Sequence, residues 1–373
     1  MKKTAFTFIF ITVFSVCTLF AQKEEIVIGK KHTIHSVILN QNRDIYIHLP
    51  EGYDNNVSNY PVLYIMDAEN TFKPLSGLVE LNSWLRTIPK MIVVGIPNID
   101  RNKDFNLGVD SLPGRGNADK FISFFKNELF PYINKNYRTE SFKILYGYSY
   151  TGMFTIHCFK NYPETFNAYI AGSPSLKHNI DKLCNDTFPI KKLDKNIFLH
   201  ISIGEKESQE YIDNVNRFSS YLKSQESDKL QWESYVVNDA THATNLPLSF
   251  SYGVNFIYSD WVKIQQVIYE GMASIEQHYA SLSEKYGYRV KIPEDIFQIL
   301  GTYCLKNNKI DMSIEIFQKY VSTYNTSFTA YNYLGEALLT KQQTKKAEEN
   351  FKKAVELKPD YEEAKENLKR INE

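Results

Sequence analysis

Short apolar runs and longer amphipathic segments alternate along the chain up to about residue 262. The runs are continuous, which is typical of strands buried on both faces of a sheet. They occupy residues 62–67, 91–98, 142–149, 168–174 and 196–204. Two earlier segments, 33–39 and 43–50, alternate apolar with polar residues and are separated by an Asn-Gln-Asn turn signal. This order predicts an α/β fold, a doubly wound and mostly parallel sheet covered by helices on both faces.

The segment 117–137 has the periodicity of a helix with one buried face. The apolar residues that share this face are Phe121, Phe124, Phe125, Leu129 and Ile133. Asn117 stands where the N-cap of such a helix is expected.

After about residue 262 glycine becomes rare, and long segments rich in Lys, Glu, Gln and Ala follow. Gly301 and Gly335 lie 34 positions apart, as do Phe317 and Phe351. This spacing and the small residues around it resemble the tetratricopeptide repeat. We expect an all-α helical region over 266–373, with repeats at about 294–327 and 328–361 and a closing helix at 361–372. The first copy is degenerate.

Residues 1–21 carry two lysines, an apolar stretch and a small residue, Ala21, before Gln22. This pattern predicts a secretory signal peptide cut after Ala21, and therefore an exported protein that is periplasmic or secreted. A retained membrane anchor is the alternative, which the short apolar stretch disfavours. We expect no membrane span in the mature chain.

The composition gives no reason to expect a nucleic-acid partner. Lys+Arg and Asp+Glu both number 43, so the net charge is zero. Three cysteines remain after the signal, Cys158, Cys184 and Cys304, and their spacing suits neither a disulfide framework nor a metal site. Whether any two of them pair is open.

A possible nucleophile lies in the segment Gly-Tyr-Ser-Tyr-Thr-Gly, where Ser149 follows a buried strand and precedes a predicted helix. A sharp turn at this place lifts the serine Oγ clear of the backbone, and the next N–H, of Tyr150, can face a developing oxyanion. The pattern departs from Gly-x-Ser-x-Gly because Thr151 stands where the second glycine is expected, although Gly152 follows.

A nucleophilic serine needs a base and an orienting acid. His242 lies in a polar loop after a late strand, where an exposed histidine without function is the alternative. Glu205 and Glu207 follow the apolar run 196–204, at a carboxyl end of the sheet. Spacing does not decide between them, and Asp213 and Asp239 are further candidates.

Four segments in a fixed order carry a resemblance to a known family. They are YPVLYIMDAENTF, VVGIPNIDRNKDF, ADKFISFFKNELFPYINKNYRTESFKILYGYSYTG and THATNLPLSFSYGVNFIYSDW. Over about residues 33–262 the chain resembles the putative esterase family of α/β-hydrolases, whose members include siderophore esterases, feruloyl esterases and S-formylglutathione hydrolases. The resemblance places an α/β-hydrolase domain at 22–265 and implies a serine hydrolase that needs no cofactor and no metal.

The resemblance also assigns residues. The family's nucleophile falls on Ser149, its histidine on His242 and its acid on Glu207, three positions after Gly204. The family's Asp-Gly is Asp67-Ala68 here, so a backbone N–H of Ala68 or Glu69 is implied as the second oxyanion donor.

Two residues near this site are candidates for contacts with the substrate. Tyr148 replaces the family's histidine before the nucleophile and is bulkier, so it reshapes the mouth of the site. Arg101 matches a family arginine. It is predicted either to bind an acidic group of the substrate or to form an ion pair with Asp104 or another carboxylate.

We therefore expect an exported serine esterase with a Ser-His-Glu triad, acting on a small-molecule ester such as a siderophore or polysaccharide-linked ester. The repeats are expected either to add a surface for a protein partner or only to pack on the hydrolase domain, and the sequence leaves both open. The alternative is a non-catalytic interaction protein, in which a decayed hydrolase domain supports a peptide-binding repeat array.

Overall fold

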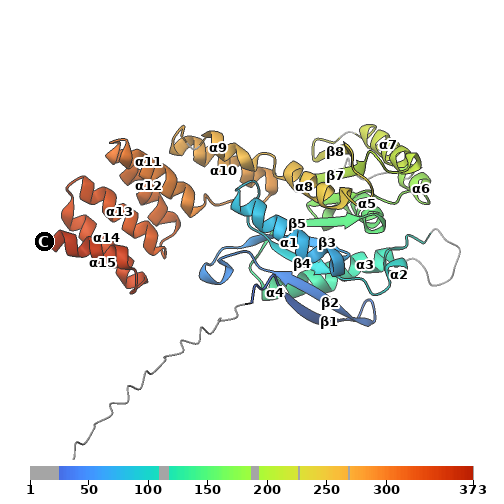
Figure 1. Ribbon diagram of the computed structural model, residues 1–373, viewed down its shortest axis with the longest axis horizontal. Helices are drawn as coiled ribbons and strands as arrows, with labels where there is room; N and C mark the ends of the chain where they lie inside the picture. Colours follow the sequence, from blue (N-terminus) through green and yellow to red (C-terminus); the bar gives the residue numbers. More distant parts are fainter. Residues whose placement is uncertain (1–24, 109–116, 186–192, 226, 268, 373) are drawn as a thin grey trace, which may run out of the picture.

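The computed structural model describes residues 25–108, 117–185, 193–225, 227–267 and 269–372 (Figure 1). The predicted signal peptide, residues 1–21, lies outside this part of the chain. Figure 1 shows a sheet with helices on its faces and, beyond it, a separate row of helices formed by the later part of the chain.

One sheet of eight strands, in the order β1-β2-β4-β3-β5-β6-β7-β8, organises the first part of the chain. The strands are β1 (Lys30–Ser36), β2 (Gln41–His48), β3 (Tyr60–Met66), β4 (Ile92–Ile96), β5 (Thr139–Tyr148), β6 (Ala168–Gly172), β7 (Ile197–Gly204) and β8 (Leu230–Val237). The first two strands pair antiparallel, and β2 also runs antiparallel to β4. From β4 to β8 all neighbours are parallel, and the predicted mostly parallel sheet is thereby confirmed.

Helices cover both faces of the sheet, because the central strands bury apolar side chains on both sides. The helices of this part are α1 (Ala68–Trp84), α2 (Arg101–Phe105), α3 (Ala118–Phe124), α4 (Phe130–Asn136), α5 (Tyr150–Asn161), α6 (Ile180–Asn185), α7 (Gln209–Lys223) and α8 (Asn245–Ile257). Side chains of α3 to α7 belong to one hydrophobic core, and those of α1 and α8 belong to the other.

The helical segment predicted at 117–137 contains one irregular turn. The π-helical element η2 (Phe125–Leu129) joins α3 to α4. All five predicted core residues of this segment are fully buried, including the neighbours Phe124 and Phe125. Asn117 occupies the N-cap position of α3, as predicted, although its side chain makes no capping hydrogen bond.

The later helices have the predicted all-α repeat arrangement. They are α9 (Ile264–Val267), α10 (Met272–Tyr286), α11 (Glu294–Lys306), α12 (Ile310–Thr323), α13 (Phe328–Thr340), α14 (Thr344–Leu357) and α15 (Glu362–Asn372). A Cβ added at Gly301 would lie 2.3 Å from Phe317, and one added at Gly335 would lie 2.6 Å from Phe351. The two helices of each repeat therefore approach closely at a glycine that faces a phenylalanine ring.

The helix α10 connects the two parts of the fold through aromatic side chains. The ring of Tyr286 lies 5.4 Å from Phe142 of β5 and 6.0 Å from Phe198 of β7, centre to centre. Its hydroxyl donates a hydrogen bond to the carbonyl of Ile257. One hydrophobic core runs from the sheet through α10 into the repeats. The domain boundary at residue 265 stays a prediction, and these contacts favour a boundary beyond α10.

Candidate active site

Ser149 lies in the tight turn between β5 and α5 and is half-buried. Its backbone has φ 58° and ψ −112°, a conformation that a residue with a side chain adopts only under strain. A Cβ at Gly147 would lie 2.2 Å from the carbonyl oxygen of Thr151, so the turn requires glycine there. Among the described residues the Ser149 hydroxyl makes no hydrogen bond, and the fold does not engage it elsewhere.

The structure explains how the turn accommodates Thr151 in place of glycine. The Thr151 side chain is fully buried, and its hydroxyl donates to Oδ2 of Asp67 at 2.6 Å. The Thr151 hydroxyl oxygen also accepts the backbone N–H of Tyr148 at 2.9 Å. The helix α5 approaches the end of β6 most closely at Gly152 instead, where a Cβ would lie 2.9 Å from the carbonyl oxygen of Gly172.

Glu207 and His242 lie against each other across the carboxyl ends of β7 and β8. Oε2 of Glu207 is 2.7 Å from Nδ1 of His242, while Oε1 accepts the N–H of Gly204 at 2.9 Å. The Glu207 side chain is only 2% exposed and that of His242 is 46% exposed. Burial alone raises the pKa of Glu207, but hydrogen bonds from His242, Ser173 and the Gly204 N–H outweigh it and hold this pKa below its ordinary value.

The other candidate acids have different partners. Glu205 accepts the backbone N–H of Asp239 at 2.8 Å. The Asp239 carboxylate pairs with Lys206 at 2.8 Å, and Asp213 accepts the side-chain amide of Gln209 at 2.9 Å. Of the four acids that the sequence left open, Glu207 is the one in contact with His242.

The N-termini of α1 and α5 lie at neighbouring strand ends, because β3 and β5 pair in parallel. The first N–H groups of a helix have no acceptor inside it. Ala68 and Glu69 begin α1 and Tyr150 begins α5, so the predicted oxyanion donors lie on adjacent helix N-termini. The Glu69 carboxylate accepts the side-chain amide of Asn98 at 2.8 Å.

Arg101 forms an ion pair with Asp67 and not with Asp104. Its Nε lies 2.9 Å from Oδ1, and Nη2 donates to Oδ2 at 3.0 Å and to the carbonyl of Tyr148 at 3.2 Å. The predicted ion pair is therefore confirmed with another carboxylate, Asp67, whereas Asp104 is held by the buried Arg43 at 2.7 Å. With its side chain 38% exposed, Arg101 lies beside the serine turn, and its contact with substrate stays a prediction.

Tyr148 is almost fully buried. Its hydroxyl contacts the hydroxyl of Ser173 at 2.9 Å and also donates to the carbonyl oxygen of His242. The ring centre lies 5.2 Å from that of His242. These contacts support the histidine loop, and a substrate contact by Tyr148 stays a prediction.

Sequence reasoning assigned no role to the side chains of three polar residues beside the site: Asp67, Ser173 and Asn245. Asp67 and Ser173 each directly follow a buried strand next to the strand of Ser149. Their position directly after the carboxyl end of a strand was the feature of the sequence that could have marked them as site residues. Asn245 opens α8 and is buried, and nothing in its local sequence distinguishes it.

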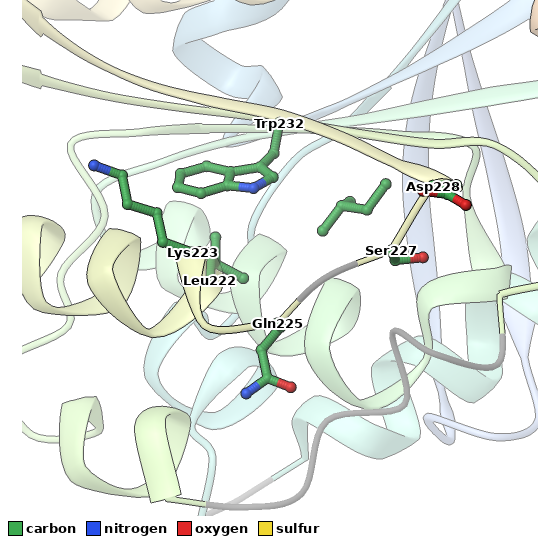
Figure 2. A pocket seen from close by; sticks show the side chains of 7 residues that line it. Leu222, Lys223, Gln225, Ser227, Asp228 and Trp232 are labelled. Atoms are coloured by element: carbon green, nitrogen blue, oxygen red, sulfur yellow. The ribbon is translucent and has the colours of Figure 1, made fainter.

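Two cavities lined by described residues lie away from Ser149. The pocket drawn in Figure 2 is lined by residues of α7, of the segment before β8 and of the start of β8, including Lys223, Asp228 and Trp232. Its volume is about 420 Å³. A larger cavity of about 1120 Å³ is lined by residues near the starts of β3 and β5 and by the later helices. Both lie toward the amino ends of parallel strands, whereas Ser149 and Glu207 follow carboxyl ends.

Three further features of the described residues bear on the predictions. They contain no group of three His, Cys, Asp or Glu side chains that could hold a metal ion. None of their helices has the length and apolar character needed to cross a membrane. The cysteines Cys158, Cys184 and Cys304 are all unpaired, which settles the pairing that the sequence left open.

Comparison with known proteins identifies the family. The model of the putative esterase family matches residues 36–245, and a tetratricopeptide repeat model matches residues 328–361. The ferri-bacillibactin esterase of Bacillus subtilis is 27% identical over 193 residues, which cover 46% of this chain and 63% of that protein. A siderophore triacetylfusarinine C esterase of Aspergillus fumigatus is 37% identical over 136 residues, covering 32% of this chain and 45% of that protein.

The matched part is therefore less than two thirds of either relative. Among solved structures, an IroE-like serine hydrolase from Shewanella oneidensis superposes with a TM-score of 0.69 at 24% identity, covering 80% of this chain and 99% of that one. The sheet order, the family match and this likeness in fold agree. The chain belongs to the putative esterase family of α/β-hydrolases and carries a tetratricopeptide repeat in its later, helical region.

Proposed function

We propose that this chain is a serine esterase with Ser149 as nucleophile, His242 as general base and Glu207 as the orienting acid. The contact between Glu207 Oε2 and His242 Nδ1 at 2.7 Å carries the proposal. An imidazole whose Nδ1–H is held by a carboxylate presents its other nitrogen as a base. The strained turn at Ser149 and the family match support the same assignment.

The reaction follows from these roles. Ser149 Oγ attacks the ester carbonyl while His242 Nε2 takes the serine proton, and the N–H groups of Tyr150 and of Ala68 or Glu69 stabilise the oxyanion. The alcohol leaves with the proton from His242, and an acyl-enzyme remains. Water, deprotonated by His242, then releases the acid and restores the serine hydroxyl. This route requires neither a metal nor a cofactor.

A siderophore ester is the substrate class that we favour. Both curated relatives described above are named for esterase activity on siderophores, one bacterial and one fungal. An ester linked to a polysaccharide is the second candidate. We further propose that residues 1–21 direct export, so that the enzyme acts in the periplasm or outside the cell.

We also propose that the helical region contributes a surface for a protein partner. The repeat match supports this role. The same region also packs against the sheet through α10, so it stabilises the hydrolase domain in addition to any role in partner binding.

Hydrolysis of esters by the purified chain tests the proposal. We expect turnover of nitrophenyl acetate, a higher kcat/KM on a ferric siderophore lactone, and loss of both activities in Ser149→Ala. Folded wild-type protein that hydrolyses neither substrate would contradict the esterase assignment. Turnover of nitrophenyl acetate with no preference for the lactone would contradict the substrate class alone.

A further inference from the structure

Ser173 directly follows β6, the strand next to that of Ser149. It is fully buried, and its backbone has a φ of 40°. Its N–H donates to the carbonyl of Ser202 at 2.7 Å, which fixes the main chain. Because glycine adopts a positive φ without strain, a serine at this position keeps its side chain at a conformational cost.

Three polar groups surround the Ser173 hydroxyl. Its oxygen lies 2.5 Å from Glu207 Oε1, 2.8 Å from Nδ2 of Asn245 and 2.9 Å from the hydroxyl of Tyr148. An amide nitrogen only donates and an ionised carboxylate only accepts. The Ser173 proton therefore goes to Glu207, and the serine oxygen accepts from Asn245. The single proton of the Tyr148 hydroxyl goes to the carbonyl oxygen of His242, so Tyr148 contacts Ser173 without donating to it.

The two carboxylate oxygens of Glu207 have different hydrogen-bond partners. Ser173 and the Gly204 N–H both donate to Oε1, which leaves Oε2 directed at His242. Tyr148, which contacts Ser173, also donates to the carbonyl oxygen of His242. One buried group of residues thus holds both the acid and the histidine loop.

We propose that Ser173 is a positioning residue, which fixes the Glu207 carboxylate for its contact with His242 while Asn245 orients its hydroxyl. The expected effect of Ser173 on kcat rests on the proposed function, whereas its effect on the position of the Glu207 carboxylate does not. Ser173 touches neither the ester nor the nucleophile in this scheme, and it acts through Glu207.

Two variants separate the hydroxyl from the backbone. Ser173→Gly removes the hydroxyl and relieves the strain of the positive φ, whereas Ser173→Ala removes the hydroxyl and keeps the strain. Ser202 offers a matched control in the neighbouring strand, because it is equally buried and its hydroxyl has no partner among the described residues. Ser202→Ala therefore reports the effect of a buried serine substitution alone.

The kinetic test is a double-mutant cycle with Glu207→Gln. We expect Ser173→Gly and Ser173→Ala to lower kcat about 10- to 100-fold, on the scale of a lost hydrogen bond to a charged group, with KM nearly unchanged. In the Glu207→Gln background the Ser173 substitutions should cost no further activity, because their target is already altered. Equal losses in both backgrounds would overturn the proposal.

A second measurement does not depend on turnover. In protein labelled with ¹⁵N-histidine, the Nδ1 proton of His242 should give a downfield resonance protected from exchange, assigned by its loss in His242→Gln. We expect Ser173→Gly to abolish this protection and Ser202→Ala to keep it. A protected proton in Ser173→Gly would overturn the proposal, whereas an inactive wild type that shows the expected pattern would overturn only the esterase assignment.

Discussion

Thr151 donates a hydrogen bond to Asp67 across 2.6 Å, and this contact joins the N-terminus of α5 to that of α1. Asp67 also accepts from Arg101 and from the side-chain amide of Asn98. Thr151, which replaces the glycine of the motif, therefore holds the carboxylate of Asp67 in place. Asp67 itself precedes Ala68, which replaces the second glycine of the family pattern. The two glycines of the family pattern that are replaced, at Thr151 and Ala68, therefore lie on the two helix ends that this single contact connects.

Thr151→Val tests the contact with Asp67. The substitution keeps the shape of the side chain but leaves the Asp67 carboxylate and the N–H of Tyr148 each without one partner in a buried site. We expect the free energy of unfolding to fall by about 1–3 kcal/mol in urea titrations, the usual cost of an unsatisfied buried polar group. Thr151→Ser keeps the hydroxyl and should remain close to wild type. A valine variant as stable as wild type would contradict this role of the contact.

The sheet was predictable from the sequence because strands buried on both faces leave continuous apolar runs, as at 62–67 and 196–204. The order of Ser149, Glu207 and His242 along the chain was also visible. What local pattern could not give was pairing between distant polar residues, such as Asp67 with Arg101. Such contacts depend on which strand ends become neighbours, and this is set by the sheet order.

The π-helical turn at Phe125–Leu129 was also beyond reach of the sequence pattern. The same five apolar residues fit an uninterrupted α-helix, so periodicity does not distinguish the two. Likewise, the sequence composition changes near residue 262, but the aromatic contacts of α10 with the sheet cross that point. A change in amino-acid composition along the chain therefore does not mark where the hydrophobic core of the hydrolase ends.

Glu207→Gln and Glu205→Gln distinguish the acid. Glutamine at position 207 cannot stabilise the imidazolium that forms during attack, so we expect kcat to fall by about 10²- to 10⁴-fold. Glu205 binds a backbone N–H on the exposed side of the loop, and its substitution should cost less than about tenfold. Measured under the same conditions, a larger loss at position 205 would reverse the assignment.

The pH dependence of stability reports the same carboxylate. Because the hydrogen bonds around Glu207 hold its pKa below the ordinary 4.5, its ionised form stabilises the fold above that pH. The stability advantage of wild type over Glu207→Gln should therefore be complete at neutral pH and shrink as the pH falls below about 4.5. Urea titrations across this range measure it, with Ser202→Ala as a control for a buried substitution. An advantage that grows on acidification would show that the pKa of Glu207 is raised.

Chains truncated at two points test where the hydrolase core ends. A chain of residues 22–265 loses Tyr286 and Tyr288, whose rings pack against Phe142, whereas a chain of residues 22–292 keeps them. We expect the shorter chain to be insoluble, or less stable by about 3–5 kcal/mol, the scale of removing a large buried aromatic side chain. Tyr286→Ala in the full chain should also lower the free energy of unfolding, because it removes the same aromatic contact with Phe142. Equal stability of the two truncated chains would place the boundary at residue 265.

Covalent labelling with a fluorophosphonate tests the central claim, that Ser149 is an activated nucleophile, without knowledge of the natural ester. A fluorophosphonate reacts with serines that a neighbouring base activates, and the modified residue can be located by peptide mass spectrometry. We expect wild-type protein to be labelled at Ser149, Ser149→Ala not to be labelled, and His242→Gln to be labelled far more slowly. Folded wild-type protein that is not labelled, or is labelled at another serine, would contradict the account.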